Sequence, residues 1–207
     1  MSLGQNNSND IFPVEADDDQ TLISRSRQGD MDAFGRLIEK YQDRLFNAVF
    51  RIAANRDDAM ELTQEAFVRA LKGLQKFKAQ ATFYTWLFRI GVNLAINHRR
   101  RHREILSSSF GGDSRLGQQA DPLAAMVETD APSPLDEVQL QEEHQRVLDV
   151  LKTLQPNARA LVVLRDIEGL NYNQISEILD LPTGTVKSRL SRARKAIREE
   201  LLLKQER

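Results

Sequence analysis

The sequence predicts an all-α protein made of two small helical domains joined by a flexible linker. Apolar residues recur at three- and four-residue spacing in both halves of the chain, which is typical of amphipathic helices. No stretch shows the alternation of apolar and polar residues that marks a half-buried strand. Between the two halves the periodicity stops in a segment rich in Ser, Gly, Pro and Asp, as expected of a tether. A chain of 207 residues is long enough for two modest cores.

Three helices are expected in the first domain, residues 21–104. Residues 30–55 carry apolar side chains along one helical face. Residues 57–74 begin with acidic residues, which the helix dipole favours in the first turn. The third run, 82–103, has an apolar inner face at first and becomes wholly polar and basic from Asn97.

Two segments without a helical pattern flank this domain. Residues 1–20 contain five acidic residues and neither Lys nor Arg, and we expect them to form a disordered N-terminal tail. Residues 105–135 form the predicted linker, with four acidic residues against one Arg. The linker is therefore expected to be a mildly acidic tether.

The second domain, residues 136–207, ends in a predicted helix-turn-helix. After an initial helical stretch, residues 157–167 form a helix that Gly169 ends. Residues 172–179 then form a short helix, a tight turn follows, and residues 183–201 form the last helix. This spacing fits a motif in which the second helix enters the major groove of DNA.

The composition excludes several classes of protein. Without any cysteine the chain can form neither a disulfide nor a thiolate metal site, and it suits a reducing cytoplasm. No apolar run is long enough to span a bilayer and the N-terminus is not a secretion signal, so we expect a cytoplasmic protein without membrane insertion. The chain has no nucleophile elbow, phosphate-binding glycine loop or metalloprotease motif, and its three His are scattered. We therefore expect no enzymatic activity, no metal and no cofactor.

The net charge of -1 conceals two strongly basic stretches, residues 98–103 and 187–198, and each of them is expected to meet phosphates. Residues 83–103 also combine aromatic rings, amides and guanidinium groups, which is a composition suited to unpaired bases. At helical spacing, however, Phe83 and Trp86 are more simply interpreted as core residues. The basic face of the last helix could likewise be a solvated surface, but its coincidence with the turn favours DNA binding.

Four stretches resemble the extracytoplasmic-function branch, group 4, of the sigma-70 family. They read DAFGRLIEKYQDRLF, DDAMELTQEAFVRAL, FYTWLFRIGVNLAINHRR and LNYNQISEILDLPTGTVKSRLSRARKAI, and they occur in the order found in the family. The resemblance covers residues 20–104 and 136–203. It implies that the first domain is sigma region two and the second is sigma region four.

The resemblance also implies three binding surfaces. In the family, one helix of region two docks on the clamp helices of the largest subunit of core RNA polymerase. The positions that match it are Asp58, Glu61, Leu62, Gln64, Glu65 and Phe67. The positions that match the segment capturing the minus-ten element are Lys78, Gln80, Thr82, Arg89, Asn93, Asn97 and Arg100. The positions that match the helix reading the minus-thirty-five element are Thr185, Lys187, Ser188, Arg189, Ser191, Arg192 and Arg194.

The implied function is that of a sigma factor, which directs core RNA polymerase to promoter DNA and helps to melt it, in a stress or envelope response under an anti-sigma factor. One alternative from the residues alone is a stand-alone helix-turn-helix regulator that binds duplex DNA unaided. A weaker alternative is an anti-terminator or RNA-binding protein that uses only residues 83–103. Dependence of DNA binding on core polymerase would distinguish a sigma factor from the stand-alone regulator. The RNA-binding alternative would have no use for a duplex reader at residues 183–198.

Three positions depart from the family pattern. Asn97 stands where many members carry Asp, which could alter base preference. Ser176 replaces a common Ala, and Asp180 replaces a common Gly. Asp180 falls in the turn where a left-handed backbone is expected, a conformation that Asp tolerates better than most residues.

Overall fold

The computed structural model describes residues 18–78, 80–109 and 149–205, and within these ranges all regular secondary structure is helical. This agrees with the predicted all-α class. Most of the expected N-terminal tail and of the expected linker lies outside the described residues. None of the described helices is both long and apolar enough to cross a membrane.

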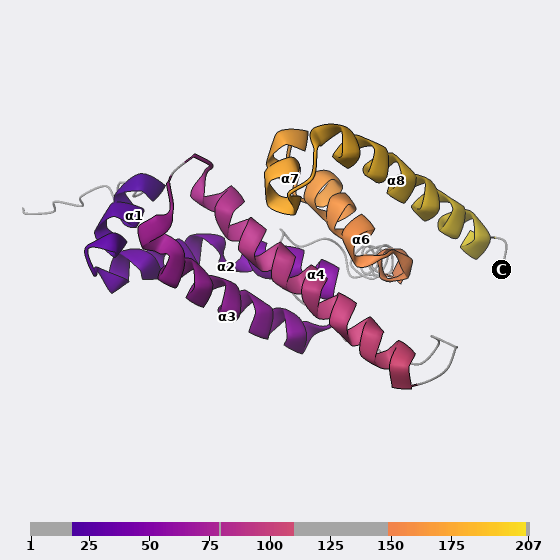
Figure 1. The fold of residues 1–207 in the computed structure, drawn as a ribbon, viewed down its shortest axis with the longest axis horizontal. Helices are drawn as coiled ribbons and strands as arrows, with labels where there is room; N and C mark the ends of the chain where they lie inside the picture. Colours follow the sequence, from indigo (N-terminus) through magenta and orange to yellow (C-terminus); the bar gives the residue numbers. More distant parts are fainter. Residues whose placement is uncertain (1–17, 79, 110–148, 206–207) are drawn as a thin grey trace, which may run out of the picture.

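The first domain is a bundle of long helices with one short helix at its end. Its elements are α1 (Asp19–Arg27), α2 (Met31–Ala53), α3 (Arg56–Gly73), the 3-10 turn η1 (Leu74–Lys76) and α4 (Phe83–Ser109). Helices α2, α3 and α4 pack on one another, and α1 packs against α2 (Figure 1). The three long helices match the three runs that the apolar spacing predicts.

Side-chain caps explain where α2 and α3 begin. Asp30 accepts a hydrogen bond from the backbone N–H of Ala33 at 3.0 Å, and Asn55 accepts one from Asp58 at 2.9 Å. Each cap satisfies an amide that the first turn of a helix leaves without a partner. Between the two helices, Ala54 adopts a left-handed conformation with φ of 57° and turns the chain. These local signals let α3 fold back along α2.

A glycine allows α4 to approach α2 closely. A Cβ atom added at Gly91 would lie 2.8 Å from Cδ1 of Leu45 and 3.3 Å from Cγ2 of Val49. A side chain at this position would require the Leu45 side chain to shift within the packed core. Gly91 therefore allows the side chains of α2 to pack directly on the backbone of α4.

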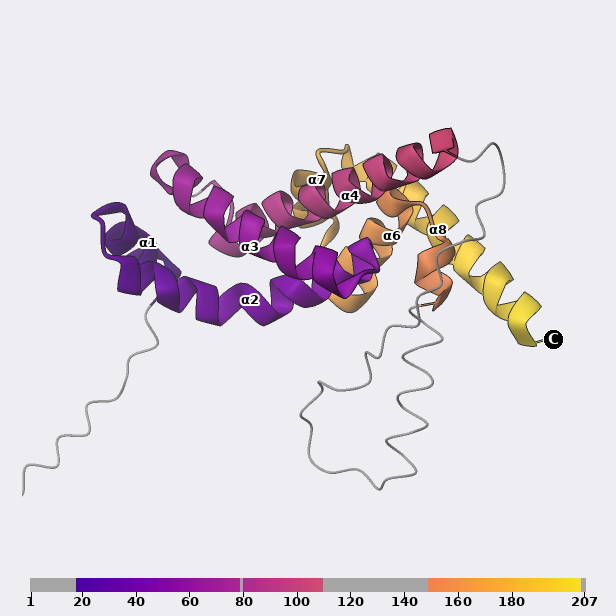
Figure 2. The same cartoon turned by 90° about the horizontal axis from the view of Figure 1, so that it is seen from below.

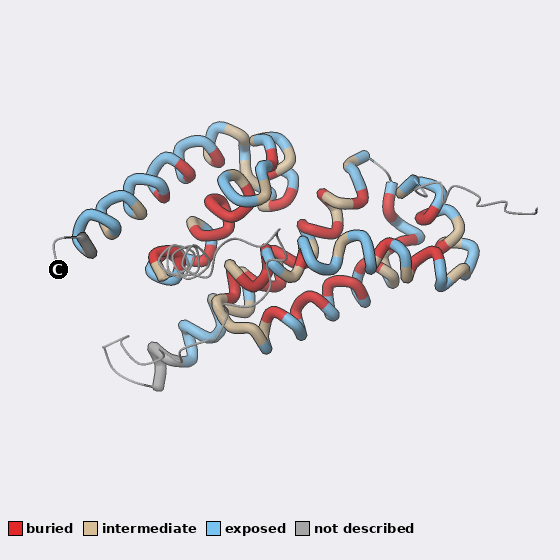
Figure 3. Tube along the Cα trace, turned by 180° about the vertical axis from the view of Figure 1, so that it is seen from behind, coloured by how far each residue is buried: buried red, intermediate tan, exposed pale blue. Residues whose placement is uncertain are grey.

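The second domain contains the predicted helix-turn-helix. Residues 149–153 are helical, followed by α6 (Pro156–Val162), the π-helical turn η2 (Val163–Ile167), α7 (Tyr172–Leu179) and α8 (Thr183–Gln205). Helix α8 packs on α6 and α7 and projects beyond them, so that most of its length is exposed (Figure 3). Helices α7 and α8 form the expected motif.

The turn between α7 and α8 confirms the expectation for Asp180. This residue has φ of 53° and ψ of 51°, which is the left-handed conformation. Ser176 supports the same turn, because its hydroxyl donates to the carbonyl oxygen of Leu181 at 2.5 Å. Both family departures, Ser176 in α7 and Asp180 directly after it, therefore act on the turn between α7 and α8.

Three boundaries differ from the sequence predictions. Helix α1 begins at Asp19, inside the segment expected to be disordered, because Leu22 and Ile23 are buried against the bundle. Helix α4 continues to Ser109, into the expected linker. The helix expected over 157–167 is α-helical only to Val162 and then widens into η2.

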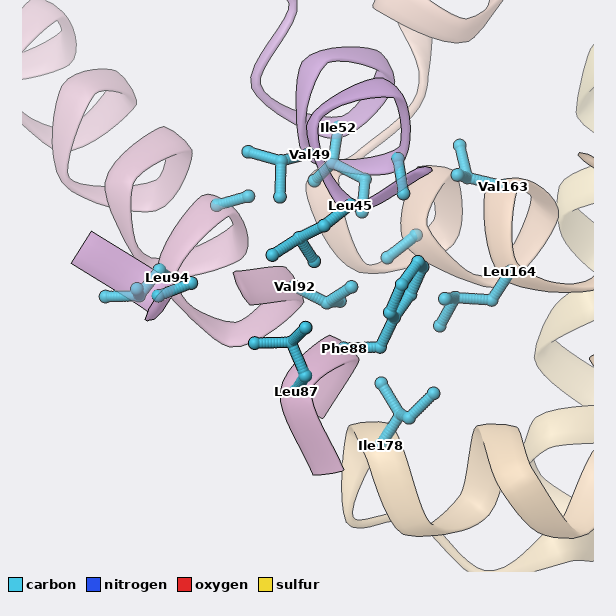
Figure 4. Close-up of a cluster of buried hydrophobic side chains, with 14 of the residues drawn as sticks. Leu45, Val49, Ile52, Leu87, Phe88, Val92, Leu94, Val163, Leu164 and Ile178 are labelled. Carbon is cyan, nitrogen blue, oxygen red and sulfur yellow. The ribbon is translucent and has the colours of Figure 1, made fainter. Parts of the chain in front are cut away.

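The two domains are packed together, which the sequence analysis does not predict. Helix α4 lies between the first bundle and helices α6 and α7, as two perpendicular views show (Figures 1 and 2). Side chains from both domains form one continuous buried cluster (Figure 4). The labelled members are Leu45, Val49, Ile52, Leu87, Phe88, Val92, Leu94, Val163, Leu164 and Ile178.

Candidate nucleic-acid interface

A pocket of about 400 Å³ opens between α3 and α4. Its lining consists of Arg69, Trp86, Arg89, Ile90, Asn93, Leu94 and Asn97. The volume lies at the lower end of the range for small-molecule sites. Apolar and aromatic side chains with a few amides and guanidinium groups can enclose a flat base and hydrogen-bond its edge. The pocket therefore has the size and chemistry for an extruded nucleobase.

Three of the minus-ten candidates lie together at this pocket. Arg89 and Asn97 are exposed at its rim, and Asn93 is partly buried between them. Asn93 is also engaged elsewhere, because its Nδ2 donates to the carbonyl oxygen of Ile178 at 3.5 Å. The helical spacing of four residues places all three on one face of α4.

The remaining minus-ten candidates lie outside the pocket. Lys78 and Gln80 are exposed in the segment that precedes α4. Thr82 has a structural role, because its Oγ1 accepts a hydrogen bond from the backbone N–H of Thr85 at 3.1 Å and caps α4. Arg100 is exposed beyond the pocket and lies 3.9 Å from a carboxylate oxygen of Glu104.

The aromatic residues divide between core and pocket. Phe83 and Phe88 are buried, so the simpler interpretation of Phe83 as a core residue is confirmed. Trp86 remains partly exposed and lines the pocket, with its ring centroid 4.9 Å from that of Phe77. The sequence analysis did not single out Arg69 of α3, which also lines the pocket. The four-residue spacing between Glu65 and Arg69 could have indicated that they lie on the same face of α3. Nε of Arg69 donates to Oε1 of Glu65 at 3.0 Å.

The polymerase-binding candidates on α3 divide in the same way. Glu61, Gln64 and Glu65 are exposed, whereas only 6% of Leu62 and 6% of Phe67 is exposed. Leu62 and Phe67 belong to the core of the bundle because they face α2 and α4. Leu62 and Phe67 can therefore hold α3 in place, but they are not accessible to a docked polymerase.

Two further features complete this face of α3. The exposed side includes two apolar residues that the sequence analysis did not single out, Met60 and Val68, which are 46% and 50% exposed. Their helical spacing with Gln64 could have indicated them. Asp58 lies at the start of the helix, partly buried, with a carboxylate oxygen 3.6 Å from Nδ1 of His98.

The outer face of α8 is basic along its first four turns. Val186, Leu190 and Ala193 are buried on the inner face, which leaves Lys187, Arg189 and Arg192 exposed on the other. Ser188 and Ser191 are also exposed, and Thr185 is partly buried. Such a face can place guanidinium groups and hydroxyls against base edges and phosphates.

Two cations of this face also have partners within the domain. Nε of Arg194 donates to Oδ2 of Asp166 at 3.1 Å, and this pairing raises the pKa of Arg194. Nζ of Lys187 lies 5.4 Å from the centroid of the Tyr172 ring. Arg194 is therefore held by the domain that it belongs to, whereas Arg189 and Arg192 extend from the exposed face.

A cluster of arginines lies where the basic end of α4 meets α6. Arg159 is 1% exposed, and burial together with the neighbouring Arg99 and Arg103 lowers its pKa to about 10. Burial and the charge of Arg103 also lower the pKa of Arg99. The described residues contain no group of three His, Asp or Glu side chains able to hold a metal ion.

Two family models match the chain. The model for Sigma-70 region 2 matches residues 37–105, and the model for Sigma-70, region 4 matches residues 144–197. The chain is 33% identical over 188 residues to the ECF RNA polymerase sigma-E factor of Haemophilus influenzae, a match that covers 88% of this chain and 95% of that protein. It is 36% identical over 181 residues to the ECF RNA polymerase sigma-E factor of Escherichia coli K12, with 86% of this chain and 92% of that protein covered.

The fold is also similar to solved structures. The structure of CnrH in complex with the cytosolic domain of CnrY superposes with a TM-score of 0.63 at 25% identity, covering 89% of this chain and 97% of that one. The sigma factor RpoE in complex with the anti-sigma factor NepR from Bartonella quintana has a TM-score of 0.59 at 24% identity, covering 84% and 98%. The second similarity supports the fold alone.

Proposed function

The chain belongs to the sigma-70 family, in its extracytoplasmic-function branch, and from this premise we propose how its surfaces bind core RNA polymerase and promoter DNA. As a sigma factor it directs core polymerase to promoters and supports initiation. The observation that carries the assignment is the presence of both sigma regions, in order, on one chain. The protein acts through binding energy, with no covalent step of its own, and it works in the cytoplasm where the polymerase is.

Core polymerase docks on the exposed face of α3. Glu61, Gln64 and Glu65 give this face its charge and polarity, and Met60 and Val68 add apolar area. An acidic face with a few apolar residues suits a basic helical partner, such as the clamp helices, because complementary charge steers the encounter while apolar contacts hold it. Asp58 contributes from the first turn of the same helix.

The pocket between α3 and α4 captures an unpaired base of the minus-ten element. Trp86 and Ile90 form the apolar wall of the pocket. Asn93 and Asn97 hydrogen-bond the edge of the base, and Arg89 binds the phosphate backbone of the DNA strand. Enclosure of each base contributes about 1–3 kcal/mol, which is available only after strands separate. Binding therefore favours the melted promoter. Lys78, Gln80, Thr82 and Arg100 extend the contact along the strand.

Helix α8 reads the duplex at the minus-thirty-five element. Its N-terminal turns enter the major groove, where the side chains of Lys187, Ser188, Ser191 and Arg192 reach base edges. Thr185, Arg189 and Arg194 lie nearer the phosphates. The turn set by Asp180 supports this role because it fixes the angle between α7 and α8.

The chain is regulated by an anti-sigma factor. The support is the similarity to CnrH, whose solved structure is a complex with the cytosolic domain of CnrY. A regulator of this kind would bind across both domains and keep the promoter-binding surfaces from use. Co-purification of the chain with a candidate anti-sigma protein, followed by loss of transcription, would test this.

Transcription in vitro tests the function as a whole. Purified core polymerase, the chain and a library of genomic promoter fragments should give transcripts with defined start sites, whereas core polymerase alone should not. Failure to initiate on every template would contradict the proposal. DNA footprinting without polymerase serves as the control, because a stand-alone regulator would protect its site unaided and a sigma factor would bind only weakly.

A further inference from the structure

We propose that Arg99 and Arg103 of α4, together with the buried charge of Arg159 of α6, form a binding site for a phosphate group. These three residues, the arginine cluster, lie where the basic end of α4 meets α6. None of them lines the pocket between α3 and α4. The site is therefore additional to the surfaces of the proposed function and does not depend on it.

Arg159 brings a positive charge into the interior of the protein, where it is 1% exposed. Its Nη1 donates to the carbonyl oxygen of Ile52 at 2.9 Å, and its Nη2 donates to the carbonyl oxygen of Lys152 at 2.7 Å. Its Nε has no hydrogen-bond partner among the described residues. Carbonyl oxygens carry no formal charge, so these hydrogen bonds hold the side chain in place and leave its charge without a counter-charge.

Two arginines of α4 add their charges at the same place. Arg99 and Arg103 are four residues apart and therefore lie on one face of the helix. Arg99 is partly buried, and its Nε also lacks a partner within the part of the chain that the structure describes. Arg103 is exposed, and its Nη1 donates to Oε1 of Gln155, directly before α6. The cluster is thus open to solvent on the side of Arg103.

The three charges are close enough to act on one another. Burial lowers the pKa of Arg159, and the charges of Arg99 and Arg103 lower it further. Burial and the charge of Arg103 have the same effect on the pKa of Arg99. The carboxylate of Asp58 opposes this effect at Arg99, but it lies beside His98, 3.6 Å from Nδ1. A bound anion would relieve the repulsion that remains.

The absence of acidic partners sets the cluster apart from its neighbour in the sequence. Nε of Arg100 lies 3.9 Å from Oε1 of Glu104. Among the described residues, by contrast, no carboxylate forms an ion pair with Arg99, Arg103 or Arg159. Keeping an uncompensated charge inside a fold is costly, and like charges beside it increase the cost. The arrangement therefore favours a ligand of opposite charge.

A phosphate group fits this arrangement better than a carboxylate. A guanidinium group is planar and binds phosphate oxygens through paired, charge-assisted hydrogen bonds. A terminal phosphate group has three free oxygens and about two negative charges, so it can bind Arg99 and Arg103 together. Arg159 need not touch the ligand, because its charge acts through the protein interior, where screening is weak. A carboxylate has fewer oxygens and would balance less of the charge.

Calorimetric titration of the full chain with inorganic pyrophosphate would test the site. We expect one saturable site at constant ionic strength. Arg99→Gln and Arg103→Gln should each raise the Kd about tenfold or more, because a charge-assisted hydrogen bond is lost. Arg101→Gln is the matched control, since it removes the same charge from an exposed position of the same helix. If Arg101→Gln weakened binding as much as Arg103→Gln, only general attraction would be at work and the site would be wrong.

The contribution of the buried charge needs its own pair of variants. Arg159→Met removes the charge and Arg159→Lys retains it, while both disturb the hydrogen bonds to Ile52 and Lys152. Arg159→Met should therefore bind pyrophosphate more weakly than Arg159→Lys, and equal affinities would remove Arg159 from the site. Circular dichroism would verify the fold. The variants at Arg99 and Arg103 decide on the site even where Arg159→Met does not fold.

Chemical modification would locate the ligand and identify its source. Phenylglyoxal reacts with accessible arginines, and mass spectrometry reports the modified positions. Pyrophosphate should slow the modification of Arg99 and Arg103 but not that of Arg101. A second arm replaces pyrophosphate with a short DNA duplex. Protection by the duplex alone would assign the phosphate to the backbone of DNA, whereas protection by pyrophosphate would show that a free phosphate compound is sufficient. Protection by neither ligand would overturn the proposal.

Discussion

Neighbouring arginines of α8 have different surroundings, although they lie two residues apart in the sequence. Arg194 is hydrogen-bonded to Asp166 of the same domain, whereas Arg192 extends from the exposed face. Replacing Arg194 would thus remove an ion pair within the second domain as well as a contact with DNA. Arg192 is the better probe of base reading for that reason.

Arg192→Ala should weaken promoter use by about 1–3 kcal/mol at a single minus-thirty-five base pair, because one guanidinium contact to a base edge is lost. Association with core polymerase should be unchanged. The measurement is competitive transcription on promoters substituted at one position at a time. A uniform loss on all sequences would indicate a phosphate contact instead.

Asp180 should be replaceable by glycine without loss of stability. Its left-handed backbone is strained for a residue with a Cβ atom, and glycine relieves that strain while increasing the entropy of the unfolded chain. We expect Asp180→Gly to change the free energy of unfolding by less than about 1 kcal/mol. Asp180→Val should lower it by about 1–2 kcal/mol, because branching at Cβ makes this conformation more costly. Denaturant unfolding would measure both.

At the level of the helix, α3 uses one face for packing in the bundle and the opposite face for the proposed binding of polymerase. The side toward α2 and α4 is apolar and buried, and the other side carries the residues proposed for polymerase binding. This division makes the exposed face open to substitution without loss of the fold. The helix can therefore be tested as a docking surface.

Glu61→Lys combined with Glu65→Lys should reduce association with core polymerase by about tenfold or more, because like charges would then face a basic partner. Glu39→Lys combined with Asp43→Lys, at two exposed positions of α2 with the same spacing, is the control for the change in net charge. Co-purification and titration with labelled chain would report the effect. Unchanged association of the double variant would remove α3 from the docking surface.

The helices with a periodic apolar face were predicted from the sequence, including the eight-residue α7, whereas α1 was not. The helices α2, α3, α4 and α8 each bury a periodic set of apolar residues, so the sequence predicts them, and the caps at Asp30 and Asn55 agree with their starts. Helix α1 has only nine residues, and its order comes from burial against the bundle, which is a tertiary effect. The widening at η2 leaves no mark in the apolar pattern, because Val163 and Leu164 are buried in either helix type.

The sequence placed Arg89, Asn93 and Asn97 on one helix, and the structure brings them together at the pocket. The pocket is also lined by Arg69, which comes from another helix and was not predicted. A periodic pattern assigns residues to a face of one helix and cannot tell which helix lies opposite. Leu62 and Phe67 were assigned to the docking surface by their match to the family, and the structure places both in the core.

At the scale of the whole molecule, the two domains share one core. Helix α4 buries residues over a wide part of its circumference, including Leu87, Phe88, Val92 and Leu94, because it has neighbours on both sides. A narrower apolar stripe would suffice for a helix packed only in the first bundle. The width of this stripe is the sequence signal for the contact between domains.

Wild-type chain should therefore unfold in one cooperative transition. Phe88→Ala should lower the free energy of unfolding by about 3–5 kcal/mol and split the transition in two, because the cavity lies between the domains. Leu37→Ala, at an equally buried position inside the first bundle, should lower stability without separating the transitions. Scanning calorimetry would show both results. A single transition in Phe88→Ala would mean that the domains do not depend on this contact.

Because η2 is a π-helical turn, the orientation of Glu168 depends on how many residues this turn contains. Its wide hydrogen bond runs from the N–H of Glu168 to the carbonyl oxygen of Val163 at 2.9 Å, five residues back, where a regular α-helix would reach back four. Nε of Arg44 in α2 donates to Oε2 of Glu168 at 3.0 Å. Removing one residue from this turn would rotate Glu168 by about 100° around the helix axis and carry its carboxylate away from Arg44. Arg44 and Glu168 would both still be present, but they would no longer form an ion pair. A shift in helical phase, with no change of charge, is thus sufficient to uncouple the halves of the chain.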